Sequence, residues 1–155
     1  MKKSILIIAL AVAAAACNNG ATKSSPEQTE ETQTQEVTTS DLYGKEWNLV
    51  DLNGKAITVD TTFPKKPHLV FEKDSSRAVG NGGCNGFSTH FEVKENGGIE
   101  ISRAAATLMA CPNMDIEQQF FDILTKVKSY QIDGNSLTLY NENKEALAKL
   151  EASPQ

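Results

Sequence analysis

The chain has 155 residues, with 15 Lys or Arg against 20 Asp or Glu, which gives a formal net charge of −5. This length accommodates one folded domain with tails, and the acidic balance argues against the basic surface that nucleic-acid binding requires. No apolar run reaches the roughly 18 residues of a membrane-spanning helix. With two His and one Trp, we expect neither a metal centre nor a cofactor.

Residues 1–16 have the pattern of an export signal. A basic start precedes an apolar run, Ile5 to Ala16, that ends in small residues, as in secretory signal peptides. The junction with Cys17 resembles a bacterial lipobox, in which the cysteine is acylated and becomes the mature N-terminus, although Leu is more usual where Ala14 stands. The alternative is an ordinary secretory signal with Cys17 near the cut. Several acyl chains, palmitate among them, would anchor the protein stably to a membrane.

Residues 17–40 are expected to be a lipidated cysteine followed by a disordered tether. The segment is rich in Thr, Glu and Gln and holds no aromatic residue, so it cannot bury enough apolar surface to offset the entropy of ordering. The pair Asn18-Asn19 follows Cys17 where an aspartate is often associated with inner-membrane retention. We therefore expect a lipid-anchored protein of the bacterial cell envelope, at the outer membrane.

Strand signals dominate residues 41–155, which we expect to form a single monomeric domain. The turn sequences Asn53-Gly54 and Asp133-Gly134 predict hairpins, and apolar and polar residues alternate over 87–93 as in a half-buried strand. Leu147 and Leu150 are expected to close the sheet. About seven or eight short strands are predicted in all.

One helix is predicted over about residues 114–128. Apolar side chains recur at helical spacing from Ile116 to Val127, and Asp115 with Gln118 resembles a capping box. A late helix among many strands indicates an α+β, mainly β fold, a curled antiparallel barrel-like sheet packed on one helix.

The glycines from Gly80 to Gly86 are interpreted as a tight turn or bulge. A phosphate loop would need Lys-Ser/Thr and a helix after the glycines, but an alternating strand follows here. Glycine supplies positive φ and close backbone approach. Asn85 suits a left-handed turn or a bond to its own backbone.

With Cys17 acylated, two thiols remain, Cys84 and Cys111. An even number of thiols in an exported protein, which would fold in an oxidising compartment, favours a disulfide. A disulfide between them would close a loop of about 28 residues, a stabilisation of roughly 3.6 kcal/mol in the chain-entropy model. Two buried thiols or a redox-active pair are the alternatives. A thioredoxin-like centre needs Cys-x-x-Cys, and these cysteines are 27 positions apart.

The residues give little support to a metal site or to a catalytic nucleophile. His68 and His90 lack the short paired spacing of zinc ligands, and no nucleophile motif surrounds the Ser and Thr residues. Glu117 and the other acids near the helix start are interpreted as solvated charges that compensate the helix dipole. We predict no catalytic residue and no metal ligand.

The aromatic residues are candidates for the core. They are Trp47, Phe71, Phe87, Phe91, Phe120 and Phe121. A barrel-like sheet can also leave an apolar pocket at its mouth, which keeps an apolar ligand as an alternative.

Blocks of residues in a fixed order resemble the META domain, the HslJ-like heat-shock lipoprotein family. The blocks are Trp47-x-Leu49, Gly80-x-x-Gly83-Cys84-Asn85-Gly86-Phe87, Thr107-Leu108-Met109-Ala110-Cys111-Pro112, Glu117, and Tyr130-x-Ile132-x-Gly134-x-x-Leu137-x-Leu139. The resemblance implies a small β-rich fold with one helix and no catalytic residues, in proteins linked to stress response, antibiotic tolerance and virulence. It assigns structural roles to Trp47, Gly83, Asn85, Thr107 and Glu117.

Three functional hypotheses follow. The first is a non-enzymatic binding or stress-protective module that acts on an unknown envelope protein. The second is a carrier or sensor of an apolar small ligand held inside the sheet. The third is a thiol-redox enzyme that uses Cys84 and Cys111.

Overall fold

The computed structural model describes residues 39–58 and 64–154. The signal segment 1–16, Cys17 and the tether as far as residue 38 lie outside the described residues. Residues 39 and 40, predicted to belong to the tether, instead begin a 3-10 helix, η1 (Thr39–Leu42), whose last residue is buried. Within the described part, no helix has the length and apolar character needed to cross a membrane.

The described residues form ten β-strands, one α-helix and a second 3-10 helix. The strands are β1 (Glu46–Leu52), β2 (Lys55–Ala56), β3 (His68–Glu72), β4 (Arg77–Asn81), β5 (Gly86–Val93), β6 (Ile99–Ile101), β7 (Ala105–Ala106), β8 (Ser129–Asp133), β9 (Ser136–Tyr140) and β10 (Ala146–Ala152). The helices are η2 (Glu95–Gly97) and α1 (Asp115–Leu124).

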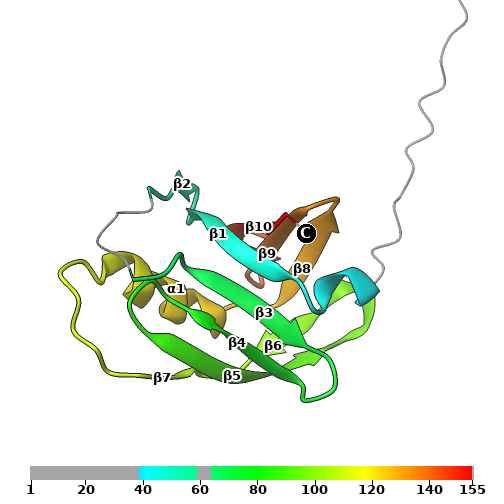
Figure 1. Cartoon of the computed structure of the whole chain (residues 1–155). Helices are drawn as coiled ribbons and strands as arrows, with labels where there is room; N and C mark the ends of the chain where they lie inside the picture. Colours follow the sequence, from blue (N-terminus) through cyan, green and yellow to red (C-terminus); the bar gives the residue numbers. More distant parts are fainter. Residues whose placement is uncertain (1–38, 59–63, 155) are drawn as a thin grey trace, which may run out of the picture. The chain divides into compact units, whose positions relative to one another are not determined.

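The strands form one curled antiparallel sheet in the order β6-β5-β4-β3-β1-β10-β9-β8, with β2 added to β1 and β7 added to β5 (Figure 1). The two ends of this order meet: Gly98 forms a bridge with Ser129, and the Ile99 N–H donates to the Lys128 carbonyl at 3.1 Å. The expected α+β, mainly β class with a barrel-like sheet is thus confirmed.

The two predicted hairpins are confirmed, but the strand predicted to close the sheet does not close it. Both predicted hairpins are present, with positive φ at Asn53, Gly54 and Gly134. The role given to Leu147 and Leu150 was wrong: β10 pairs with β1 and β9 in the middle of the sheet, and β6 and β8 close it.

The helix is shorter than predicted. It begins at Asp115 and ends at Leu124 rather than spanning 114–128, while Val127 is buried beyond its end. The predicted capping box is absent, since the N-cap residue Met114 makes no side-chain cap bond. The Asn113 side-chain oxygen instead accepts the Asp115 N–H at 3.4 Å.

The interior of the sheet is filled by apolar side chains. Trp47 is fully buried and its ring N–H donates to the Leu42 carbonyl at 3.0 Å. Of the six predicted core aromatics, all but Phe121 are buried. Phe121 is half-buried and packs edge-on against Phe87, with ring centres 5.1 Å apart.

Candidate functional site

The loop between β4 and β5 is a tight, internally bonded turn. The Asn81 side-chain oxygen accepts the Gly83 N–H at 2.7 Å, and the Gly82 N–H donates to the Asn85 carbonyl at 2.9 Å. Gly83 has φ of 122°, which favours glycine. The interpretation of this glycine cluster as a turn is therefore confirmed.

Glu117, in the first turn of α1, points its carboxylate into this loop. One carboxylate oxygen accepts the backbone N–H groups of Cys84 at 3.0 Å and Asn85 at 2.6 Å. The other accepts the Asn85 side-chain amide at 2.7 Å. Glu117 is only 2% exposed, so three donors and the N-terminal end of α1 take the place of water around the charge.

The absence of a side chain at Gly82 permits this approach. A Cβ atom there would lie 2.6 Å from Glu117 Cγ and 2.9 Å from Phe121 Cζ. Such distances are far below ordinary contact, so a side chain at residue 82 would force the side chains of Glu117 and Phe121 to shift.

Asn85 connects the turn to a third segment. Its side-chain oxygen accepts the Thr107 hydroxyl at 2.8 Å and the Met109 N–H at 2.7 Å. Its amide nitrogen donates to the Met109 carbonyl at 3.1 Å as well as to Glu117. With two donors and two acceptors occupied, the amide has its full complement of partners.

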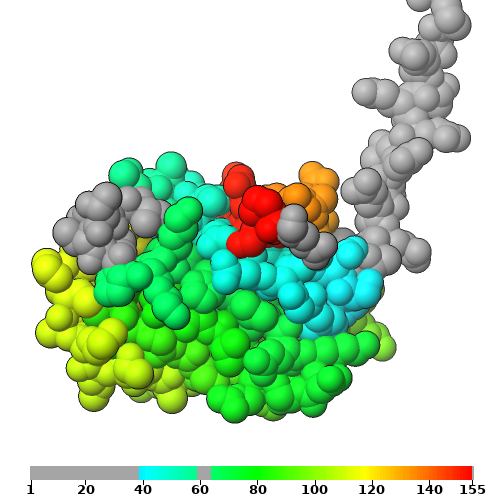
Figure 2. Space-filling view, viewed as in Figure 1, coloured from blue at the N-terminus to red at the C-terminus, as the bar shows by residue number. Residues whose placement is uncertain are grey.

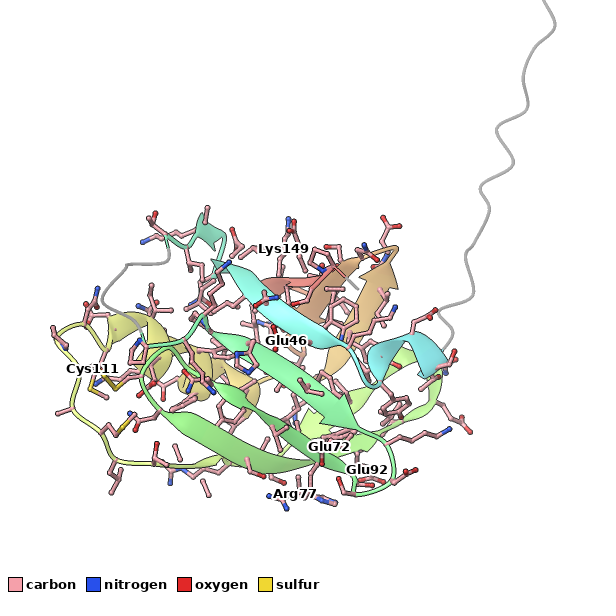
Figure 3. All side chains as sticks on the ribbon, in the orientation of Figure 1. Glu46, Glu72, Arg77, Glu92, Cys111 and Lys149 are labelled. Carbon is pink, nitrogen blue, oxygen red and sulfur yellow. A yellow bond between two sulfur atoms is a disulfide. The ribbon has the colours of Figure 1, made fainter. Side chains whose placement is uncertain are left out.

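A disulfide joins Cys84 to Cys111, with Cα atoms 6.0 Å apart (Figure 3). The first of the three thiol hypotheses is thereby confirmed. Since Cys84 lies in the turn and is 1% exposed, the bond fixes the far end of the segment that Asn85 holds at Thr107 and Met109.

The result is a constrained surface loop, residues 107–112, which we call the apolar loop. Leu108 is 99% exposed and Met109 is 52% exposed, and these are the exposed large apolar side chains of the described residues. In the space-filling view the yellow segment that contains this part of the chain forms one end of the visible face (Figure 2). A fixed loop that displays apolar side chains loses little conformational entropy when a partner covers it.

The structure brings together most of the residues singled out in the sequence: Gly83, Asn85, Thr107, Glu117 and the two cysteines. Trp47 lies apart, in the core. Two interpretations were wrong: Glu117 is buried and bonded rather than solvated, and Asn85 bonds other segments rather than its own backbone. Glu117 lies three and seven positions before two buried residues of α1, and this inward phase was the signal that could have identified it.

The two histidines lie on different strands. His90 is exposed on β5 and His68 is half-buried on β3. Within residues 39–58 and 64–154, no group of three or more His, Cys, Asp or Glu is arranged to hold a metal ion.

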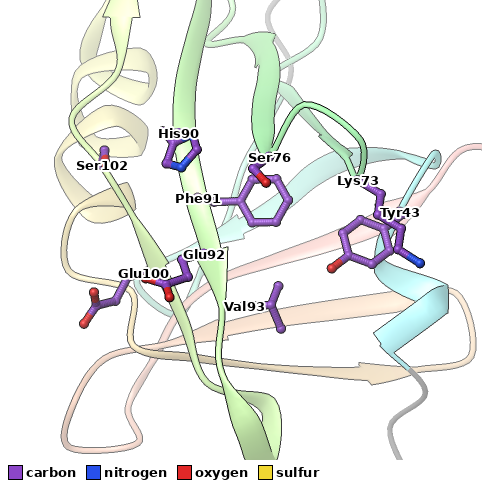
Figure 4. A pocket seen from close by; sticks show the side chains of 9 residues that line it. All are labelled: Tyr43, Lys73, Ser76, His90, Phe91, Glu92, Val93, Glu100 and Ser102. Atoms are coloured by element: carbon purple, nitrogen blue, oxygen red, sulfur yellow. The ribbon is translucent and has the colours of Figure 1, made fainter.

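A hollow of about 500 Å³ lies beside β5 (Figure 4). Its lining residues are Tyr43, Lys73, Ser76, His90, Phe91, Glu92, Val93, Glu100 and Ser102. Lys94 pairs with Glu100 at 2.8 Å, and this hydrogen bond lowers the pKa of the Glu100 carboxyl and raises that of Lys94. Charged and hydroxyl groups make this hollow a poor match for an apolar ligand.

The sequence of this domain matches a known family. The family profile of the META domain matches residues 40–154. The chain belongs to the META domain family. No curated protein matches the sequence.

Solved structures share this META fold. One protein solved by NMR has 25% identity and a TM-score of 0.57, over 75% of this chain and 96% of its own. A protein from Burkholderia xenovorans, also solved by NMR, has 20% identity and a TM-score of 0.58 over 75% and 86%. A crystal structure of a DUF4847 family protein from Bacteroides vulgatus ATCC 8482 has 17% identity and a TM-score of 0.53 over 75% and 97%. The last two likenesses concern the fold alone.

Proposed function

We propose that this META domain is a non-enzymatic binding or stress-protective module, held in the bacterial envelope by a lipid on Cys17. The observation that carries the proposal is the apolar loop: Leu108 is 99% exposed on a segment fixed by a disulfide and by Asn85. Exposed apolar side chains on a constrained scaffold are typical of interaction sites. The partner is another component of the envelope.

The binding role is tested in cells by photo-crosslinking. A photoreactive amino acid replaces Leu108 in one strain and Lys149, exposed on β10, in a control strain. We expect a discrete crosslinked product from position 108 and none from position 149. Equal products from both positions, or no product from position 108, would contradict the proposal.

The anchor is tested separately, because it rests on the sequence of residues 1–17. Cells are grown with a labelled fatty acid, and the protein is followed in membrane fractions. The chain should carry label and sediment with outer membranes, while Cys17→Ser should lose the label. A labelled Cys17→Ser protein, or an unlabelled parent chain, would contradict lipidation.

The alternative of an apolar ligand inside the sheet receives less support. Large side chains such as Trp47, Phe71 and Phe120 are fully buried in the space that such a ligand would need. Lipid extracted from protein purified from the envelope and detected by mass spectrometry would favour this alternative.

The thiol-redox alternative is also weaker than the binding role. The two cysteines are bonded to each other, and Cys84 is 1% exposed, so an attacking thiolate could reach the disulfide only at the half-buried Cys111. Rapid alkylation of both cysteines after mild reduction of the folded domain would favour an enzyme instead.

A further inference from the structure

The segment just before the apolar loop is a sheet edge. Strand β7 pairs with β5 and with no other described strand. It lies at the margin of the sheet in Figure 1. Proteins commonly protect such edges with lysine, proline or a covering element, but the sequence from 104 to 108 is Ala-Ala-Ala-Thr-Leu.

The hydrogen-bond pattern shows which backbone groups point outward. The Thr107 N–H donates to the Gly86 carbonyl at 3.0 Å, and Ala106 is opposite Phe87 in the register. Residues in an antiparallel pair alternate between bonded and non-bonded positions. The N–H and C=O of Ala106 therefore point away from β5 and are available to another strand.

A hollow of about 530 Å³ lies on the sheet beside this edge. Val79 contributes an apolar side chain to its lining, and Ala105 of β7 and the adjacent Thr107 form its border. Gly86 contributes no side chain, which leaves the hollow open. An apolar side chain of a strand added to β7 can enter it.

The residues at the two ends of segment 104–108 indicate which side chains a bound peptide would carry. Arg103, just before the segment, is exposed, and no ion pair is found for it among residues 39–58 and 64–154. At the other end, Leu108 is fully exposed on the fixed apolar loop. Both features favour an extended peptide with an acidic residue near one end and apolar residues along it.

We propose that the edge 104–108 binds an extended peptide segment of a partner protein as an added β-strand, with an apolar side chain in the hollow beside Gly86. Main-chain hydrogen bonds supply affinity in such complexes, and pockets for alternate side chains supply specificity. This inference rests on the proposed binding function and names the partner's chemistry.

The probe is a peptide selected from a random library of short linear peptides on the folded domain 39–155. Ala106→Pro removes an outward N–H only, and proline is tolerated at such positions of edge strands. Ala56→Pro is the matched control: Ile57 N–H donates to Val50 at 3.0 Å and residue 56 is opposite Asp51, so the N–H of Ala56 also points outward, on the other edge strand. Retention of the disulfide and an unchanged circular dichroism spectrum establish that both variants fold.

We expect Ala106→Pro to weaken peptide binding by about tenfold or more and Ala56→Pro to leave it unchanged. NMR of the unsubstituted domain supplies a measurement that needs no variant: the amide signals of 104–108 should shift and Ala106 should gain protection from exchange. Failure to select a peptide, equal binding by Ala106→Pro, or shifts elsewhere would overturn the proposal. A crosslink at position 108 would still support the binding function, so the two failures are distinguishable.

Discussion

At the scale of single residues, Asn85 shows how tightly this site is determined. Its amide bonds the Glu117 carboxylate, the Thr107 hydroxyl and both backbone groups of Met109. Neither aspartate nor glutamine can reproduce this set, because one lacks the donors and the other is longer by a methylene.

Asn85→Asp should be strongly destabilising. The new carboxylate would lie where an amide now donates to Glu117 at 2.7 Å, so a hydrogen bond would be replaced by repulsion between two buried carboxylates. We expect a loss of about 2–4 kcal/mol in the free energy of unfolding, measured by chemical denaturation. Asn53→Asp, in an exposed turn, is the control and should be near neutral. Equal stability of the two variants would refute the role of Asn85.

Gly82→Ala should also destabilise the domain, by about 1–3 kcal/mol, because the methyl group would collide with Glu117 and Phe121. Gly86→Ala is the matched control, since the nearest atom to its added Cβ is a carbonyl oxygen 3.8 Å away. If the denaturation curves of Gly82→Ala and Gly86→Ala coincide, the loop adjusts to a side chain at residue 82 and the prediction is wrong.

At the scale of elements, the apolar loop is held by two independent devices. The disulfide attaches it at Cys111, and Asn85 holds it at Thr107 and Met109. The loop should therefore stay in place when either device is removed alone.

Replacement of both cysteines by alanine should lower the free energy of unfolding by about 2–4 kcal/mol, measured by denaturation. Hydrogen exchange should still show protection of the Met109 amide, because that N–H donates to Asn85 at 2.7 Å. Exchange of this amide at the rate of an unstructured chain would show that the disulfide alone holds the loop. The reduced unsubstituted domain is the control for the substitutions themselves.

At the scale of the whole molecule, the seam between β6 and β8 closes the sheet. Tyr130 lies on β8 beside this seam and is 4% exposed. Burial raises the pKa of the Tyr130 hydroxyl above its ordinary value of 10.0, while a hydrogen bond with Thr39 acts in the opposite direction.

Because the folded state raises this pKa, the neutral tyrosine contributes stability that is present below about pH 10 and is lost as pH rises through the folded pKa. Tyr130→Phe should remove this part of the alkaline decline in the free energy of unfolding. Denaturation at several pH values compares the slopes. Parallel declines for the two proteins above about pH 10 would contradict the prediction.

The sequence predicted the elements well where the signal is local. Asn53-Gly54 and Asp133-Gly134 predicted their hairpins because the turn residues themselves adopt positive φ. The helix extent was less accurate, because Val127 continues the apolar stripe although it is buried outside the helix. Residue 127 is apolar because it is buried in the core, not because it belongs to the helix.

A mainly β domain with one helix, its turns, most of its core aromatics and most of the residues of the site could be predicted from the sequence. The fold features follow from local conformational preference and from periodicity, whereas the site residues were indicated by the resemblance to the META family. The folded structure was needed to show that Glu117 and Asn85 face each other, that Cys84 bonds Cys111, and that β7 is left as an open edge. Contacts between residues more than 20 positions apart depend on how the whole sheet curls. Local sequence patterns do not predict this curvature, so they do not predict those contacts.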